Sequence, residues 1–229
     1  MFLDEKMPSP DLIEAKIRQY TLERKFIPVF MGSAYKNKGV QLALDGVLRY
    51  LPSPPEKPNH GFLYNKEKKE EEMLELPTDD NLPFVGYVFK LEESRFGQLT
   101  YIRVYQGKLK RGDFVWNDKM AKKVKVSRIV KMHANNMEEI EDVKAGDIFA
   151  IFGVECATGD TLSQADNSFP VRCQRMFVPD PVMSLTINPS KQDNAAKLEK
   201  ALAKFKREDP TFSVTVDRES EEMIISGMG

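Results

Sequence analysis

In the first fifty residues, two stretches with hydrophobic residues at helical spacing flank one continuous hydrophobic run. Apolar residues recur every three to four positions over 10–24, directly after Ser9-Pro10-Asp11, a sequence typical of a helix start. A continuous apolar run covers 26–31, and a second helical pattern covers 40–51. Because a short continuous run bounded by glycine is typical of a strand buried on both faces, these patterns predict an αβα arrangement, as in a parallel α/β sheet.

The middle of the chain has the period of strands. Short β-branched and aromatic runs are separated by turn residues, with glycines at Gly107 and Gly112. The predicted strands are 84–91, 99–105, 113–117, 122–130 and 148–152. Short strands at this spacing predict a closed all-β barrel.

The last fifty residues combine both periods. A strand over 181–188 is followed by Ser190 and Asp193 at capping-box spacing, and then by a helical apolar face that ends at Asp209-Pro210. Two further strands are expected at 212–216 and 223–225. A βαββ order is the first part of a ferredoxin-like α+β domain, and because its second helix and last strand do not follow, we expect that the chain has been cut.

Composition divides the chain but does not assign its function. A length of 229 residues, with 41% hydrophobic and 30% charged residues, describes a globular protein of more than one domain. The proline-rich stretch 51–58 is expected to be a stiff connector, and we predict domains at 1–58, 59–175 and 176–229. No apolar stretch approaches the roughly 20 residues needed to cross a bilayer, so no membrane partner is expected. The first ten residues resemble neither a signal peptide nor a transit peptide.

Positive charge is concentrated in one region of the chain. The formal net charge is −1, yet residues 103–131 contain a large excess of lysine and arginine over acidic residues, and the following segment, 138–147, is acidic. Over 122–130 charged and apolar residues alternate, so one face is expected to pack inward and the other to present Lys123 and Lys125 to solvent, with Arg128 also expected in solvent. Two interpretations remain open: lysines that protect an edge strand from aggregation, or side chains that contact RNA phosphates. The candidates for RNA contact are Lys108, Lys110, Arg111, Lys123, Lys125 and Arg128.

Catalytic and metal-binding side chains have no suitable spacing. Cys156 and Cys173 form no CxxC pair, and His60 and His133 are isolated. We therefore expect free thiols in a reducing compartment, no metal site and no catalytic residue.

Several stretches resemble one family in one order. RFGQLTYIRVYQGKLKRGD at 95–113, KMHANN, KAGDIFAIFG and CATGDTL closely resemble the second domain of elongation factor G, the ribosomal translocase GTPase, in its mitochondrial form. GSAYKNKGVQ before them resembles the end of that family's GTPase domain. VPDPVMSLTI, EDPTFSV and IISGMG after them resemble the start of its third domain.

The resemblance implies a nucleotide contact but no complete nucleotide site. It identifies 1–58 as the C-terminal piece of a P-loop GTPase fold, and Ser33, Ala34, Tyr35 and Lys36 as the guanine-contacting loop, whose small alanine lets a backbone N–H reach the base. The chain has no GxxxxGK[ST] phosphate loop, no DxxG segment and no NKxD motif; 65–68 begins like the last but lacks its aspartate. GTP and Mg²⁺ are therefore expected only in an intact protein, and this chain alone should be inactive.

The implied function is to couple nucleotide state to ribosome binding during translocation of tRNA and mRNA. The implied partners are the ribosome and its small-subunit RNA, the implied location is the mitochondrial matrix, and we expect a monomer. Two alternatives remain open. One is a related translational GTPase of the ribosome-recycling or release-factor type, and the other is a self-contained β-barrel RNA-binding adaptor without nucleotide chemistry.

Overall fold

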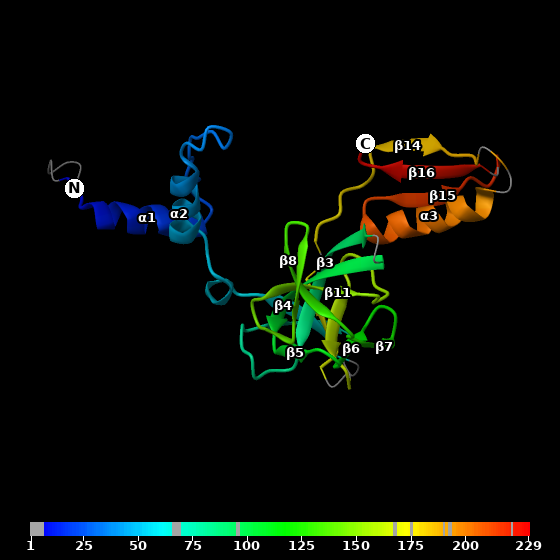
Figure 1. Cartoon of the computed structure of the whole chain (residues 1–229), viewed down its shortest axis with the longest axis horizontal. Helices are drawn as coiled ribbons and strands as arrows, with labels where there is room; N and C mark the ends of the chain where they lie inside the picture. Colours follow the sequence, from blue (N-terminus) through cyan, green and yellow to red (C-terminus); the bar gives the residue numbers. More distant parts are fainter. Residues whose placement is uncertain are drawn as a thin grey trace. The chain divides into compact units, whose positions relative to one another are not determined.

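The chain contains two compact units, Met1–Lys57 and Pro58–Gly229. A computed structural model describes residues 7–65, 70–94, 97–166, 169–174, 176–189, 191, 194–220 and 222–229. The first unit contains α1 (Pro10–Leu22), α2 (Val40–Tyr50) and the short 3₁₀ helix η2 (Pro54–Glu56). The strands of the second unit's barrel region are β1 (His60–Asn65), β2 (Glu70–Glu75), β3 (Val85–Ser94), β4 (Gly97–Gln106), β5 (Lys108–Lys110), β6 (Phe114–Asn117), β7 (Lys122–Lys125), β8 (Ile129–His133), β9 (Asn136–Ile140), β10 (Asp142–Lys144), β11 (Ile148–Phe152), β12 (Thr161–Gln164) and β13 (Val171–Cys173). They are followed by β14 (Met183–Thr186), α3 (Ala195–Glu208), β15 (Ser213–Val216) and β16 (Met223–Gly227) (Figure 1).

Both predicted helices of the first unit are present. The Ser9 hydroxyl oxygen accepts a hydrogen bond from the Leu12 backbone N–H at 3.3 Å, and Pro10 begins α1, so the predicted helix start is confirmed. The second helix, α2, covers almost the whole predicted range.

The strand predicted at 26–31 is wrong. The described residues of this unit contain no strand, and Ile27, Val29 and Met31 are more than four-fifths exposed. A strand buried on both faces needs strands beside it to satisfy its backbone hydrogen bonds, and the described part of this unit supplies none. Phe30 instead packs on α2, where a Cβ added to Gly46 would lie 2.3 Å from the phenyl ring.

An eight-stranded antiparallel sheet forms the barrel region of the second unit. Its strand order is β7-β6-β12-β3-β4-β11-β8-β9, and β5 pairs separately with β10. Register shifts near Gly86 and between Val88 and Lys90 bend the β3–β4 pair, which lets the sheet curve. The predicted all-β domain is thus present, with turn glycines at the expected places.

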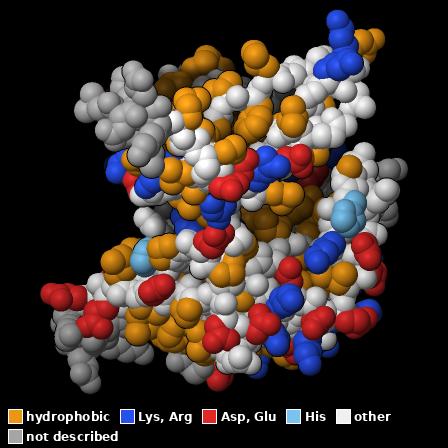
Figure 2. Space-filling model, turned by 90° about the vertical axis from the view of Figure 1, so that its left-hand side faces the viewer, with side chains coloured by type: hydrophobic (Ala, Val, Ile, Leu, Met, Phe, Trp, Pro, Cys, Tyr) orange, Lys and Arg blue, Asp and Glu red, His pale blue; other side chains and the backbone are white. Residues whose placement is uncertain are grey.

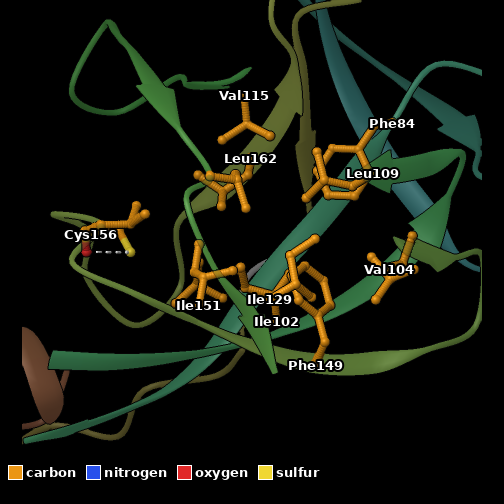
Figure 3. Close-up of a cluster of buried hydrophobic side chains, with 14 of the residues drawn as sticks. Phe84, Ile102, Val104, Leu109, Val115, Ile129, Phe149, Ile151, Cys156 and Leu162 are labelled. Atoms are coloured by element: carbon orange, nitrogen blue, oxygen red, sulfur yellow. Dashed lines mark hydrogen bonds between the residues drawn. The ribbon is translucent and has the colours of Figure 1, made fainter. Parts of the chain in front are cut away.

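One hydrophobic core lies inside the curved sheet. Alternate residues of β4, including Ile102 and Val104, are fully buried, as the period of a strand requires. Figure 3 shows these side chains directed toward Phe149, Ile151 and Leu162 from other strands. Residues from β3 to β12 therefore fold around a common centre.

The strand predicted at 122–130 is two strands. The chain leaves the ladder after Lys125 and returns at Ile129. Between them, the fully buried Val126 donates its backbone N–H to the Asp113 carbonyl at 2.8 Å and accepts from Gly112 N–H at 2.7 Å. These hydrogen bonds to the 112–113 turn and the burial of Val126 interrupt the pairing of the strand with its neighbours. The alternation of charged and apolar residues does not predict this interruption.

The last region has the predicted βαββ order. Its strands are arranged β14-β16-β15, with β16 antiparallel to both neighbours. Figure 1 shows α3 along one face of this sheet, where the Phe205 and Phe212 rings meet edge to face at 6.1 Å. The capping pair predicted at positions 190 and 193 lies outside the described residues.

Candidate functional site

The predicted guanine loop is a closed turn just before α2. Ser33 and Lys38 exchange two backbone hydrogen bonds, at 2.9 and 3.0 Å, and the Ser33 hydroxyl accepts from Lys36 N–H at 3.4 Å. Ala34 and Tyr35 are exposed at the tip. Among the described residues, no acceptor takes the N–H of Ala34 or Tyr35, so both amides can donate to a carbonyl oxygen outside the chain.

Two glycines make the base of this loop possible. Gly39 has a φ of +72°, and a Cβ there would lie 2.5 Å from the Met31 carbonyl oxygen. A Cβ on Gly32 would lie 2.6 Å from the Lys38 carbonyl oxygen. Since real Cβ atoms do not approach so closely, glycine at both positions is what allows the two arms of the loop to meet.

The loop fits a contact with a base but not with a nucleotide triphosphate. It offers backbone amides only, and the described residues contain no group of three or more His, Cys, Asp or Glu side chains that could hold a metal ion.

Three of the six predicted RNA-contact residues are held by acidic neighbours. Lys108 Nζ lies 3.4 Å from an Asp80 oxygen, and Arg111 lies 3.5 Å from Glu141. Arg128 donates to Glu139 through both Nε and Nη2, at 3.0 and 2.5 Å. Because β9 pairs with β8 and β10 with β5, the acidic segment of the sequence lies against the basic one.

Charge is consequently mixed on the surface rather than separated. On the face shown in Figure 2, basic and acidic side chains are interspersed over most of the surface. Lys110 lies opposite Asp142 in the β5–β10 ladder. The local basic excess in the sequence thus does not become a broad positive surface around these residues.

Lys123 and Lys125 have a different setting, on edge strand β7. They lie directly across from Trp116 and Phe114 of β6, so these four side chains share one face, which we call the aromatic–lysine face. Lys123 Nζ lies 4.8 Å and Lys125 Nζ 6.0 Å from the centre of the Phe114 ring, which is 45% exposed. No acidic partner for either lysine is found among the described residues.

The two aromatic residues of this face were not predicted as functional. Their signal is the alternation over 114–117, where Val115 and Asn117 are buried and Phe114 and Trp116 are not. An exposed ring between two ammonium groups can stack on a nucleic-acid base while the lysines approach phosphates. Lysines on an edge strand also deter aggregation, so both interpretations of Lys123 and Lys125 agree with their position.

Both cysteine thiols are buried and have raised pKa values. Cys156 and Cys173 are free, and burial raises the pKa of the Cys156 thiol to about 11 and that of Cys173 to about 12. Cys156 Sγ contacts the Val154 carbonyl at 3.6 Å within the core (Figure 3). A thiol with a pKa so far above 7 is almost entirely protonated at neutral pH, and it is therefore a poor nucleophile.

These pKa shifts predict slow alkylation of the folded chain. Burial disfavours the thiolate, so at pH 8 the ionised fraction of Cys156 should fall about 100-fold relative to an exposed cysteine, since each pKa unit above the pH is tenfold. Iodoacetamide labelling followed by mass measurement should leave both thiols unmodified in the native protein and modify both in urea. An added exposed cysteine, Thr215→Cys on β15, is the control and should react at once. Rapid native labelling of Cys156 or Cys173 would contradict the buried assignment.

The remaining candidate chemistry is weak. His133 Nε2 lies 3.5 Å from Glu138, and both side chains are exposed, as in a surface ion pair. In the part of the chain that the structure describes, no helix is both long and apolar enough to cross a membrane.

Comparison with known proteins identifies two regions. Residues 97–163 match the family model described as elongation factor Tu domain 2, and residues 178–229 match that described as elongation factor G, domain III. A crystal structure of a protein from Thermus thermophilus matches with a TM-score of 0.71 at 24% identity; the match covers 100% of this chain and 31% of that one. This likeness concerns the fold, and the chain spans about a third of the matched protein's length.

Proposed function

We propose that this chain, which carries an elongation factor Tu domain 2 region followed by an elongation factor G domain III region, is a segment of a ribosomal translocase. In this proposal the intact protein binds GTP and Mg²⁺, and this segment links the nucleotide site to the ribosome. The order of the two matched regions, barrel first and βαββ domain second, supports it. The segment contributes binding and coupling and carries out no chemistry of its own.

The guanine contact and the location belong to the same proposal. The turn formed by Ser33, Ala34, Tyr35 and Lys36 would give the guanine base a backbone donor, which its two exposed amides support. The mitochondrial form and the matrix location have the support of the sequence resemblance at 152–162 and 178–187. A ribosome-recycling or release-factor relative with the same barrel is the closest alternative within translation.

The aromatic–lysine face carries the proposed contact with small-subunit ribosomal RNA. Its lysines lack acidic partners in the described structure, whereas Lys108, Arg111 and Arg128 are neutralised within the barrel. A cation that already forms an ion pair must give it up to bind phosphate, and an unpaired one need not. We therefore assign RNA contact to Lys123 and Lys125 before the other four candidates.

Removing both lysines should weaken binding to purified small ribosomal subunits. For Lys123→Gln with Lys125→Gln, we expect affinity at ~0.1 M salt to fall roughly tenfold, and the slope of log affinity against log salt to decrease by about 1.4 to 1.8. Co-sedimentation of the full chain across a salt series measures both quantities.

The matched control removes two charges elsewhere in the barrel. Lys108→Gln with Arg111→Gln changes the net charge equally but affects residues held by Asp80, Glu139 and Glu141, so its affinity should fall less than about threefold. Equal losses in the two double variants would mean that a diffuse charge effect, and not this face, holds the RNA. Failure of the unmodified chain to bind subunits at low salt would contradict the ribosome proposal itself.

A second candidate is a β-barrel RNA-binding adaptor without nucleotide chemistry. The lack of a GxxxxGK[ST] phosphate-loop motif in the sequence favours it, together with the exposed aromatic ring between two lysines. The same assay with a single-stranded oligonucleotide separates the two candidates. An adaptor should bind free RNA as tightly as the subunit, whereas a translocase segment should prefer the assembled subunit.

A further inference from the structure

A turn of the barrel holds the end of the helix in the following domain. Thr158 donates its backbone N–H to the Arg207 carbonyl at 3.1 Å and its hydroxyl to the Glu208 carbonyl at 2.9 Å. The last four carbonyls of an α-helix have no partner within the helix, and Arg207 and Glu208 are the last two residues of α3. Thr158 therefore caps a helix that belongs to the neighbouring domain.

The barrel presents this threonine on a rigid support. Buried Asp160 accepts hydrogen bonds from the Ala157 backbone N–H at 2.9 Å and from Asn117 Nδ2 at 3.1 Å. Gly159 and Asp160 also exchange backbone hydrogen bonds with Val88 of β3, at 2.8 and 2.9 Å. The turn that carries Thr158 is thus held by hydrogen bonds within the barrel, separate from those to α3.

The rest of the junction is thinly packed. A cavity of about 370 Å³ lies beside Thr158, with Tyr87 of the barrel on one side and Met176, Val178 and Pro210 of the following segment around it. An exposed ion pair, Arg207 with Glu155 at 3.9 Å, adds little. The Met176 N–H also donates to the Tyr87 hydroxyl at 3.3 Å, so the Thr158 contacts and this hydrogen bond share the attachment.

We propose that the turn 155–160 is a releasable latch between the barrel and the βαββ domain. In the closed state Thr158 caps α3. In the open state both domains keep their folds while α3 leaves the turn, and the last turn of α3, no longer capped, frays and exchanges its amides. A latch of this size changes the relative mobility of two domains without the cost of unfolding either, and it does not depend on ribosome binding.

The test compares hydroxyl loss with hydroxyl retention in the full chain. Thr158→Val keeps the shape of the side chain but leaves the Glu208 carbonyl without this donor, so we expect α3 to open about fivefold more often, the usual effect of one lost hydrogen bond. Thr158→Ser keeps the donor and should behave as the unmodified chain. Hydrogen–deuterium exchange of peptides covering 195–208 measures the opening, and spin labels at Glu138→Cys and Lys200→Cys measure the distance between the domains.

A second variant tests the same junction by charge. Glu155→Lys places like charges at the Arg207 contact, so it should also open the latch, and salt should reduce its effect through screening. The opening caused by Thr158→Val should not depend on salt. The latch is wrong if neither variant changes exchange in α3 or the label distance. It is equally wrong if exchange in β3 and β4 rises with that of α3, because the turn would then stabilise the barrel fold and not the junction.

Discussion

Gly107→Ala is expected to destabilise the barrel by about 3 kcal/mol or more, from backbone strain and steric overlap together. Gly107 links β4 to β5 with a φ of +79°, and a Cβ there would lie 2.6 Å from the Phe84 Cα and 2.7 Å from the Leu82 carbonyl oxygen. These are backbone atoms beside a phenylalanine that is almost fully buried, so they cannot move aside cheaply. Urea unfolding followed by fluorescence of Trp116, the single tryptophan, reports on the barrel specifically.

Gly112→Ala is the matched control for this prediction. Gly112 also has a positive φ, of +92°, but a Cβ there would meet no atom within 4 Å. Its alanine should therefore cost only the conformational part, about 1 kcal/mol. Equal losses of stability at the two glycines would show that overlap with the Leu82–Phe84 backbone contributes nothing. That result would contradict the prediction.

The same two glycines show what the sequence could predict. Glycines between β-branched runs indicate turns, and the structure places Gly107 and Gly112 at turns with positive φ. The strand 148–152 was predicted with its observed ends, and β4 within two residues of them. Period and turn chemistry are local properties, so they were sufficient for these elements.

Properties that depend on distant residues were not predictable in this way. The run 26–31 has the composition of a buried strand, yet its state depends on neighbouring strands that a local pattern cannot report. In the same way, the basic residues over 103–131 predict a positive surface when the sequence is considered alone. The pairing of β9 with β8 and of β10 with β5 places acidic residues beside them, which the sequence pattern does not reveal. The pairing of Arg128 with Glu139 follows from that register and from nothing nearer in the sequence.

The candidate site was therefore only partly predictable. The sequence identified Lys123 and Lys125 by alternation, and the structure separates them from Lys108 and Arg111 by their lack of acidic partners among the described residues. The contribution of Phe114 depends on a cross-strand pairing that no single strand reveals. Which of these residues contact RNA stays a prediction for the binding assay.

Asp160 also owes its importance to distant contacts, and its replacement by alanine is expected to destabilise the barrel by about 2–4 kcal/mol. One oxygen of the buried carboxylate accepts from Asn117 Nδ2 and from the Ala157 N–H, and Lys119 Nζ lies 3.5 Å from the other. Alanine would leave the fully buried Asn117 amide without this acceptor, whereas the Lys119 ammonium remains exposed to water and loses little. The measurement is again urea unfolding followed by Trp116 fluorescence.

Asp160→Asn separates the hydrogen bonds from the charge. An asparagine can place its carbonyl oxygen where the two donors converge, but it loses the attraction to Lys119 and buries an amide NH2 at the position of Oδ1, so it should cost about 1–2 kcal/mol, less than alanine. If asparagine lowers the stability as much as alanine does, the charge of Asp160 and not its hydrogen bonds stabilises the turn. If alanine hardly lowers the stability, the turn does not need the Asp160 side chain. In the expected case the alanine variant also frees Thr158, because the Ala157 N–H is then no longer held. In Asp160→Ala, hydrogen exchange in α3 should therefore rise together with a loss of barrel stability. In Thr158→Val, exchange in α3 should rise while the stability of the barrel is unchanged. This contrast separates the hydrogen bonds that hold the turn from the contact between the turn and α3.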